Sequence, residues 1–327
     1  MSARVVVLDH AFANVLAERE AATAGGALFE EFDCGDERSA VEAARGASVA
    51  VVNFAPVTRP VLESLAPGAT VVRYGVGYDN VDIAAAGELG VTVVNVPDYG
   101  AETVADHAAA GLLALLRRLP EYHRLIIDGD WAKPTDAGAI TGFSRTTVGL
   151  VGVGRIGLAL AERLSPFGFT VLAHDPYLPA ASLEDRGIEL VDLPVLLARA
   201  EAVSLHVPLT PDTLHIVDAD FLARMRPGGI LVNTSRGGLV DCEALADAIE
   251  RQHLAGAALD VTEPEPLPAD SRLRSLPGVL LSPHAAFYST TSLENLQRLA
   301  ADEITRALQG REPRSPVTTR APQEVKA

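Results

Sequence analysis

The sequence predicts an α/β protein with parallel sheets, and three observations lead to this fold class. Short runs rich in valine and isoleucine alternate with alanine- and leucine-rich stretches along the chain, which is typical of a parallel sheet covered by helices. Most of these runs are almost wholly apolar, as expected of strands buried on both faces. The chain has 327 residues, of which 48% are hydrophobic, so two domains with substantial cores are expected rather than one.

Ten segments have the length and composition of buried strands. They are Val5–Leu8, Val49–Asn53, Thr70–Arg73, Val91–Asn95, Thr147–Val151, Thr170–His174, Val203–Val207, Ile230–Asn233, Ala257–Asp260 and Val279–Ser282. Helix start and stop signals lie between several of them. The clearest are Asn80 before Val81–Leu89 with Gly90 beyond, Asp192 before a segment with Pro194 in its first turn, and Asp241 before Glu243–Arg251.

Two longer helices are predicted outside this alternation. The stretch Glu102–Leu119 is uninterrupted before Pro120 and falls between two sets of strands, so we expect it to bridge two domains. Near the end of the chain, apolar residues recur every three or four positions, which predicts a helix with one buried face. They are Leu293, Leu296, Ala300, Ile304 and Leu308.

Composition excludes several classes of protein. The 43 acidic residues outnumber the 27 lysines and arginines, which gives a net charge of −16, so direct nucleic-acid binding is not expected. The two cysteines, Cys34 and Cys242, are far apart and match no disulfide or zinc pattern. The first apolar run is too short for a signal peptide, and no run could span a membrane. We therefore expect a cytoplasmic protein.

The strongest local motif is GVGRIG, which begins at Gly152 and ends at Gly157. It follows one predicted strand directly and opens a helical stretch, which is the context of a dinucleotide-binding turn. There the first glycine permits the tight bend, the second (Gly154) lets the backbone approach a pyrophosphate, and the third lets the helix pack on the strand. Because GxGxxG also arises by chance, an ordinary glycine turn is the alternative.

An acidic residue in the next strand region supports the first interpretation. Asp175 lies eighteen residues after Gly157, at the end of the predicted strand Thr170–His174. A carboxylate there can accept hydrogen bonds from the ribose hydroxyls and would repel the extra phosphate of NADP. We therefore expect NAD as the cofactor, with an ordinary strand-end aspartate as the alternative.

A second glycine pair, Gly75 and Gly77, lies in RYGVGYDNVD, also after a predicted strand. No third glycine follows at position 80, so the segment is not a second dinucleotide turn. Successive backbone amides in such a turn can hold a small anion such as a substrate carboxylate. A turn without function is the alternative.

Three chemically versatile residues follow predicted strands in the second half: Arg236, Glu265 and His284. Because ligands of open α/β sheets bind at the carboxyl ends of strands, these side chains are candidates for one crevice. Taken singly, each has an ordinary alternative as a surface ion pair, a loop acid or a structural histidine. Together they offer a carboxylate-binding guanidinium and a histidine whose protonated form a carboxylate can stabilise.

In five segments the chain resembles the NAD-dependent D-isomer-specific 2-hydroxyacid dehydrogenase family. In chain order they are GVGRIG, Asp175, NTSRGGLVD, ALDVTEPEPL and SPHAAFYS. The resemblance implies two doubly wound parallel-sheet domains, a Rossmann NAD domain inserted into a flavodoxin-like substrate domain. It places the substrate domain at residues 1–100 plus 291–327 and the NAD domain at residues 101–290. The implied activity is hydride transfer between NAD(H) and a small D-2-hydroxy acid or 2-keto acid.

The resemblance also implies roles for single residues. Arg236 would bind the substrate carboxylate and carbonyl, His284 would be the acid/base, and Glu265 would pair with His284. The backbone of Val76 and Gly77 would hold the carboxylate. Residues implied to line the cofactor are Arg155, Ile156, His206, Val207, Pro208, Thr234 and, on the nicotinamide side, Asp260.

Two points about the substrate follow from departures within the family. Glu265 argues against formate dehydrogenase activity, because those enzymes have a glutamine in place of the acid. Tyr99 lies where D-lactate dehydrogenases place a tyrosine near the carboxylate, although the neighbouring Asp98 departs from their pattern. A packing role for Tyr99 is the alternative.

The segments around Gly75 and His284 are most similar to the C-terminal-binding-protein branch, whose animal members are NAD-sensing corepressors. A peptide-binding scaffold is therefore the alternative function. The seventeen residues after Gly310 are too few for a long interaction tail, which favours an enzyme. The resemblance further suggests a homodimer, with Glu102–Leu119 and Asp128–Trp131 as contact regions. Trp131 would be an interface anchor or, alternatively, a core filler.

Overall fold

The computed structural model describes residues 3–129, 131, 133–179 and 182–317. The chain divides into two compact units, which are treated separately below. Unit 1 comprises Met1–Gly100 with Ser289–Ala327, and unit 2 comprises Ala101–Tyr288.

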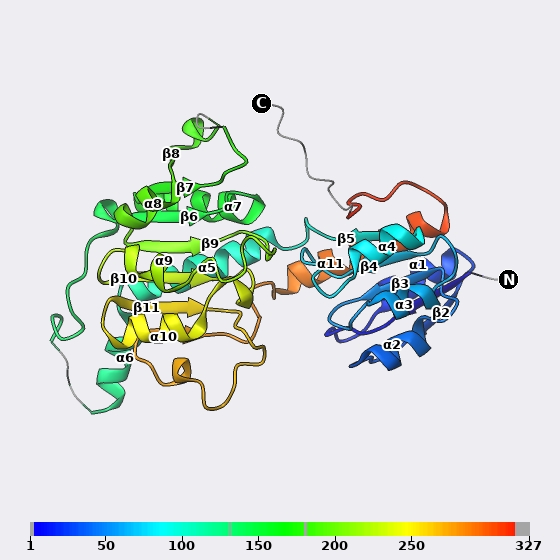
Figure 1. The fold of residues 1–327 in the computed structure, drawn as a ribbon, viewed down its shortest axis with the longest axis horizontal. Coiled ribbons are helices and arrows are strands. Elements are labelled where there is room, and N and C mark those ends of the chain that lie inside the picture. Colours follow the sequence, from blue (N-terminus) through cyan, green and yellow to red (C-terminus); the bar gives the residue numbers. More distant parts are fainter. Residues whose placement is uncertain (1–2, 130, 132, 180–181, 318–327) are drawn as a thin grey trace. The chain divides into compact units, whose positions relative to one another are not determined.

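Unit 1 is built on a five-stranded parallel sheet with the order β2-β1-β3-β4-β5 (Figure 1). Its strands are β1 (Arg4–Val7), β2 (Leu28–Glu31), β3 (Val49–Val52), β4 (Thr70–Arg73) and β5 (Thr92–Asn95). The central strands are buried valine runs. This strand order has its switch point between β1 and β3, where ligands of flavodoxin-like sheets bind.

Helices cover both faces of this sheet. They are α1 (Leu16–Ala24), α2 (Glu37–Ala44), α3 (Arg59–Ser64), α4 (Ile83–Leu89) and α11 (Thr290–Leu308). Apolar residues of α2, α3 and α4 form one core cluster with the sheet, and those of α1 and α11 form another. The predicted buried face of the terminal helix is confirmed, because Leu296, Ala300 and Ile304 are buried in the second cluster.

Unit 2 is built on a seven-stranded parallel sheet with the order β12-β11-β10-β9-β6-β7-β8. Its strands are β6 (Thr147–Val151), β7 (Thr170–His174), β8 (Ile188–Leu190), β9 (Ala202–Leu205), β10 (Gly229–Asn233), β11 (Leu254–Leu259) and β12 (Val279–Leu281). The order reverses between β6 and β9, as in a Rossmann sheet. The carboxyl ends of these two strands therefore mark the expected ligand site.

Helices also lie on both faces of the second sheet. They are α5 (Ala101–Leu116), α6 (Leu119–Ile127), α7 (Arg155–Leu164), α8 (Leu193–Arg199), α9 (Ala219–Arg224) and α10 (Cys242–Glu250). Helices α5 and α7 contribute to one core cluster, and α8, α9 and α10 to the other. Single turns of 3-10 helix occur at Phe143–Arg145, Ser165–Phe167, Glu184–Arg186, Gly237–Leu239 and Arg272–Arg274.

The predicted α/β class and all ten predicted strands are confirmed. The structure adds β2 and β8, the edge strands on one side of each sheet, whose sequences LFEE and IEL are short and partly polar because one side of each is open. Two helix predictions are corrected. Asp82, not Asn80, caps α4, and the expected helix 102–119 ends at Leu116, because Arg118 takes a left-handed conformation before α6.

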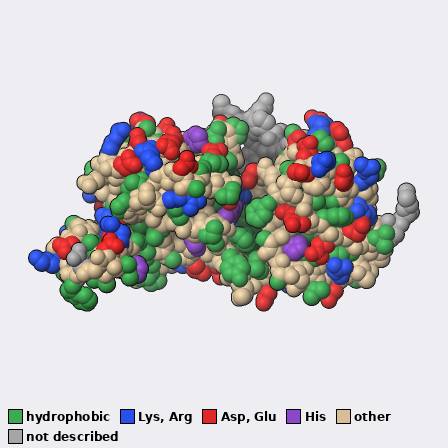
Figure 2. Space-filling model, turned by 90° about the horizontal axis from the view of Figure 1, so that it is seen from below, with side chains coloured by type: hydrophobic (Ala, Val, Ile, Leu, Met, Phe, Trp, Pro, Cys, Tyr) green, Lys and Arg blue, Asp and Glu red, His purple; other side chains and the backbone are tan. Residues whose placement is uncertain are grey.

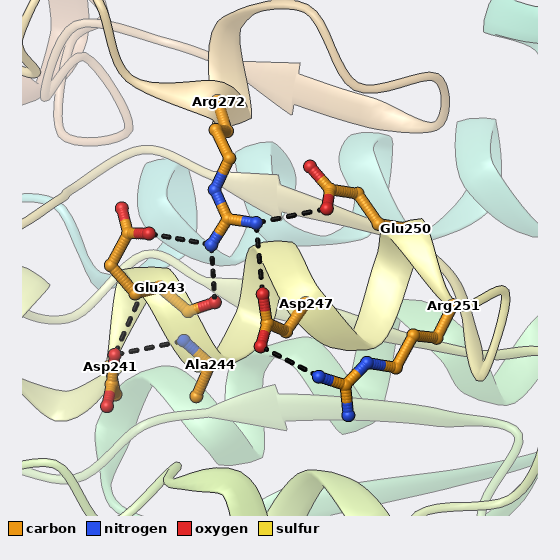
Figure 3. Close-up of polar contacts among 7 residues, drawn as sticks. All are labelled: Asp241, Glu243, Ala244, Asp247, Glu250, Arg251 and Arg272. Atoms are coloured by element: carbon orange, nitrogen blue, oxygen red, sulfur yellow. Dashed lines mark hydrogen bonds and ion pairs between the residues drawn. The ribbon is translucent and has the colours of Figure 1, made fainter.

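Ion pairs of Arg272 with three acidic residues anchor the segment after Glu265 to α10 (Figure 3). The guanidinium of Arg272 binds the carboxylates of Glu243, Asp247 and Glu250 at 2.6, 2.9 and 3.0 Å. These three acids lie on one side of α10, whose N-terminus Asp241 caps as predicted. The carboxylates raise the pKa of Arg272. The loop that carries Glu265 is thus tied to a helix at its far end.

On the face drawn in Figure 2, acidic and basic side chains are interspersed with apolar ones. Within the described residues, no helix has the length and apolar character needed to cross a membrane. Among the same residues, no three or more His, Cys, Asp or Glu side chains form a group that could hold a metal ion. Both cysteines are free thiols, Cys34 buried and Cys242 half-buried.

Candidate active site

The GVGRIG turn joins β6 to α7 at the switch point of the seven-stranded sheet. Gly152 has φ +89°, and a Cβ on it would lie 2.6 Å from the carbonyl oxygen of His206, just after β9. A Cβ on Gly157 would lie 2.5 Å from the carbonyl oxygen of Gly152. Both positions therefore exclude larger residues because backbone packs against backbone.

Gly154 differs from its two neighbours in the motif. It precedes the first residue of α7, and a Cβ there would meet no atom within 4 Å. The protein leaves open space beside this glycine, where amides at a helix N-terminus can bind a phosphate. The open space fits the pyrophosphate of a dinucleotide.

Two polar atoms near this turn lack protein partners. Among the described residues, the hydroxyl of Thr234 after β10 and Nδ1 of His206 after β9 are buried without a hydrogen bond. Buried polar groups are almost always paired, so unpaired ones need an explanation. A bound ligand at the carboxyl ends of β9 and β10 would provide one. The donor set around the switch point therefore fits the predicted cofactor.

His206 is held as a neutral side chain. Its Nε2 is 2.9 Å from the hydroxyl of Ser204, and burial lowers the pKa of His206 from 6.5 to about 4. Burial disfavours the charged imidazolium, because the ring loses its contact with water. Val207, the next residue, has a side-chain carbon 2.8 Å from where a Cβ of Gly152 would lie. The segment after β9 therefore packs against the glycine turn, at the edge of the sheet where a Rossmann domain binds its ligand.

Asp175 lies at the end of β7 and supports the same turn. One carboxylate oxygen accepts from the amide of Val153 at 3.1 Å, and the other accepts from the amide of Tyr177 at 3.1 Å. A carboxylate has about four acceptor positions, so Asp175 has capacity for ribose hydroxyls. Its hydrogen bond to Val153 fixes it beside the glycine motif.

The Arg236 loop follows β10 and is held by backbone contacts. The side-chain amide of Asn233, a fully buried residue, donates to the carbonyl of Arg236 at 2.8 Å. A Cβ on Gly237 would lie 2.0 Å from the carbonyl oxygen of Thr262. The loop therefore packs against the segment after β11 that leads to Glu265. Arg236 is half-buried, and its Nη1 donates to the carbonyl of Ser235 at 2.8 Å.

The structure brings Glu265 and His284 together. Nδ1 of His284 lies 2.7 Å from a carboxylate oxygen of Glu265. The backbone of His284 is left-handed, with φ +52°, which a residue with a Cβ rarely adopts. A carboxylate on Nδ1 fixes the tautomer and leaves Nε2 as the atom that can exchange a proton.

Asp260, at the end of β11, holds the His284 backbone. Its carbonyl accepts from the amide of His284 at 2.8 Å, and its carboxylate accepts from the amides of Ala285 and Ala286, both at 2.8 Å. Ser282 donates to the same carboxylate at 2.5 Å, and Nε2 of His107 on α5 lies 2.9 Å from the Ser282 hydroxyl. One buried aspartate thus fixes three consecutive amides.

Three further residues of this network, Ser282, His107 and Asn233, are not among the residues predicted from the sequence. A weak signal exists for Ser282 and Asn233, because each lies at the end of a predicted strand. No local pattern indicates His107, because its partner Ser282 is 175 residues away in the chain. Only the fold brings them together.

The remaining predicted cofactor residues have more modest environments. Arg155 is exposed at the start of α7, and Ile156 is half-buried after it. The carbonyl of Pro208 accepts from the hydroxyl of Thr213 at 2.7 Å. All three lie at the carboxyl edge of the sheet, but the structure gives them no contact that points to a ligand.

In unit 1 the second glycine pair forms a turn after β4. Gly75 has φ +115°, and a Cβ there would lie 2.2 Å from Nη1 of Arg73 and 3.6 Å from the ring of Tyr99. The side-chain amide of Asn95 donates to the carbonyl of Val76 at 2.7 Å. Tyr99 is half-buried against the core cluster on this face of the sheet, so it packs as well as bordering the turn. Gly77 is half-buried in the same turn.

Comparison with known proteins agrees with this geometry. Residues 109–286 match the family model described as "D-isomer specific 2-hydroxyacid dehydrogenase, NAD binding domain". The chain is 39% identical over 251 residues to a glyoxylate reductase of Korarchaeum cryptofilum, covering 76% of each chain. A solved structure, the TT0316 protein of Thermus thermophilus, has a TM-score of 0.85 at 34% identity and covers 96% of this chain and 100% of its own.

Several longer relatives are similar over the same region. The chain is 42% identical over 240 residues to a D-3-phosphoglycerate dehydrogenase of Mycobacterium bovis. The match covers 73% of this chain and 45% of the relative. The chain thus spans about half the length of these curated relatives.

Proposed function

Because the chain belongs to the D-isomer specific 2-hydroxyacid dehydrogenase family, we propose that it transfers a hydride between NAD(H) and a small D-2-hydroxy acid or 2-keto acid. The observation that carries this proposal is the pair Glu265–His284, joined at 2.7 Å in the same sheet edge as the glycine turn. The sites at Gly152, Gly154, Gly157 and Asp175, with the unpaired atoms of Thr234 and His206, would hold NAD.

We assign the substrate carboxylate to Arg236. A guanidinium offers two parallel donors to a carboxylate and also polarises an adjacent carbonyl. Asn233 and the packing of Gly237 hold the loop that carries Arg236, so the group is positioned before the substrate binds. The amides of Val76 and Gly77, in the turn of unit 1, are proposed as further donors to a carboxylate.

We assign the proton transfer to His284. In the direction of reduction, NADH would supply the hydride for the carbonyl carbon when bound, and the carbonyl oxygen would need a proton. Nε2 of His284 donates that proton, while the Nδ1–H group stays hydrogen-bonded to the carboxylate of Glu265. Glu265 thus stabilises the imidazolium before transfer and holds the ring in one orientation. In the direction of oxidation, the neutral ring accepts the proton at the same atom.

The domain roles and the assembly are also proposed. Residues 101–290 are assigned to cofactor binding and residues 1–100 with 291–327 to the substrate, supported by the family match at 109–286. A homodimer is supported by α6 and the segment after it. Its apolar side chains Leu119, Ile126 and Ile127 are exposed, and Trp131 is 92% exposed, so the core-filler alternative for Trp131 is wrong. Asp130, within the predicted contact region, lies outside the described residues.

A cytoplasmic location is proposed from the two free thiols, because disulfides are rare in that compartment. The corepressor alternative is less favoured, because the relatives found carry the names of enzymes. The similarity to the C-terminal-binding-protein branch remains a prediction.

The test compares two histidines that share a left-handed backbone and a glutamate partner but differ in their proposed role. His284 and His215 both have φ near +50° (52° and 50°), and each has a ring nitrogen 2.7 Å from a glutamate. We expect His284→Asn to lower the rate of NADH oxidation with 2-keto acids at least a hundredfold and to leave NADH binding nearly intact, since general acid catalysis contributes about 10²–10⁴. His215→Asn should keep the wild-type rate. Equal rates for the two variants would remove His284 from the mechanism.

A further inference from the structure

The carboxyl edge of the five-stranded sheet in unit 1 carries apolar side chains. Phe54 after β3 is 52% exposed, and Val76 and Tyr78 after β4 are 42% and 41% exposed. Large apolar side chains at the ligand edge of an α/β sheet are available to contact a ligand. Phe54 lies directly beside the switch point between β1 and β3, where a ligand of this sheet is expected.

The loops that carry these side chains are connected to one another. The side-chain amide of Asn80 donates to the carbonyls of Asn53 and Ala55 at 3.2 and 2.9 Å, and Val57 pairs with Val81 as an isolated bridge. The loop with Phe54 is therefore fixed to the segment that continues the glycine turn at Gly75–Gly77. A carboxylate held at that turn would have its attached side chain near Phe54.

An acidic group already uses the amides at the switch point. Asp9, which follows β1 and is 7% exposed, accepts from the amide of Asn53 at 2.8 Å and from the amide of Phe54 at 2.6 Å. Successive backbone amides of this kind can bind an anion, and here Asp9 occupies them. A second anion at this position would instead face the Asp9 carboxylate.

Positive charge to balance such an anion is scarce along this edge. The segments 8–12, 53–57, 74–82 and 95–100 contain no lysine or arginine and include Asp79 and Asp98. Arg73 ends β4, but its Nη1 donates to the carbonyl of Tyr74 at the glycine turn. His10 after β1 is paired with Glu31 at 3.0 Å. The guanidinium of Arg73 is thus engaged at the glycine turn.

We infer that the substrate is a 2-keto or 2-hydroxy acid with an uncharged, apolar side chain that packs against Phe54, and that acids with a phosphate or second carboxylate are rejected. The inference rests on the proposed function, because it names the substrate class of the same site. It separates this chain from relatives named for a phosphorylated substrate, although they are similar over most of its length.

The experiment measures kcat/KM with NADH for four acids: 2-ketoisocaproate, phenylpyruvate, 3-phosphohydroxypyruvate and oxaloacetate. We expect at least one apolar acid to exceed both multiply charged acids by at least a hundredfold, in line with the about 10–200-fold that apolar contacts provide and the added cost of an unpaired charge. Phe54→Arg should reduce this ratio at least tenfold, because it removes the apolar contact and supplies a cation.

The matched control is Leu28→Arg, which adds the same charge to the same unit. Leu28 is 62% exposed at the first residue of the edge strand β2, at the amino end of the sheet, and its variant should keep the wild-type ratio within twofold. Circular dichroism and NADH titration of both variants establish that they are folded.

Each other outcome contradicts a distinct claim. If 3-phosphohydroxypyruvate or oxaloacetate is the best substrate, or if Phe54→Arg leaves the ratio unchanged in a folded protein, the inferred substrate class is wrong while the proposed function stands. If none of the four acids is reduced, the inferred substrate class is wrong, and if pyruvate and glyoxylate are not reduced either, the proposed function itself fails.

Discussion

Gly154 allows cofactor binding to be separated from folding. It has φ −69° and ψ −162°, and a Cβ there would meet no atom within 4 Å, so Gly154→Ala introduces no clash. Replacing glycine at a permitted conformation stabilises a protein by about 0.4–1 kcal/mol through the unfolded chain. Alanine is a poorer N-cap for α7 by a comparable amount, about 0.5–1 kcal/mol. The two effects offset, so the free energy of unfolding should change by less than about 1 kcal/mol.

The same methyl group should weaken NADH binding. It would occupy the open space beside the amides of α7, where the pyrophosphate is proposed to lie, and we expect at least a tenfold higher Kd, which corresponds to about 1.4 kcal/mol. Gly157→Ala is the contrasting variant, because its Cβ would lie 2.5 Å from the carbonyl oxygen of Gly152 and should cost about 1–3 kcal/mol of stability. Urea unfolding and fluorescence titration with NADH give the two quantities. A Gly154→Ala protein with wild-type NADH affinity would refute the assignment of this space to the pyrophosphate.

Three further predictions concern stability, cofactor choice and assembly. Because burial lowers the pKa of His206 from 6.5 to about 4, the unfolded chain binds this proton first and stability falls as the pH drops through that range. Between pH 7 and pH 5, the free energy of unfolding of His206→Gln should therefore fall by about 2 kcal/mol less than that of wild type, as measured by urea unfolding. Equal decreases in the two proteins would contradict a lowered pKa of His206. Asp175→Ser should weaken the binding of NADH and reduce the preference for NADH over NADPH, as measured by kcat/KM. A wild-type protein that prefers NADPH would contradict the role proposed for this carboxylate. Ile127→Asp should shift sedimentation toward the monomer while Leu214→Asp, at another exposed site of unit 2, should not, and an unchanged Ile127→Asp would place the contact elsewhere.

Most of the fold could be predicted because the signals are local. Central strands such as Val49–Val52 are buried on both faces and read as continuous apolar runs, and Asp241 identifies the start of α10 by its capping chemistry. The edge strand β2 could not be recognised, because its sequence LFEE is half exposed and resembles a loop. The sequence predicts Asn80 as a helix cap, whereas in the structure its side-chain amide donates to the carbonyls of Asn53 and Ala55. That contact depends on the fold and leaves no local signal.

The candidate site was partly predictable for the same reason. The glycine motif and Asp175 follow from local patterns, whereas the pairing of Glu265 with His284 is implied by the family resemblance, and the 2.7 Å contact agrees with it. The hydrogen bonds that support these residues could not be predicted from the sequence, because Ser282 and His107 meet only when α5 packs against the sheet of unit 2. The unpaired atoms of Thr234 and His206 likewise depend on which partners the fold supplies.

The carboxylate of Asp260 has a consequence for how such a protein can change. Since Asp260 at the end of β11 accepts hydrogen bonds from the amides of residues 284, 285 and 286, the backbone that carries the histidine is fastened to a strand of unit 2. Phe54 belongs to unit 1, so we expect mutations around it to change side-chain preference while these contacts of the proposed proton donor are kept. A lineage with this architecture can diversify what it reduces while its chemistry stays constant.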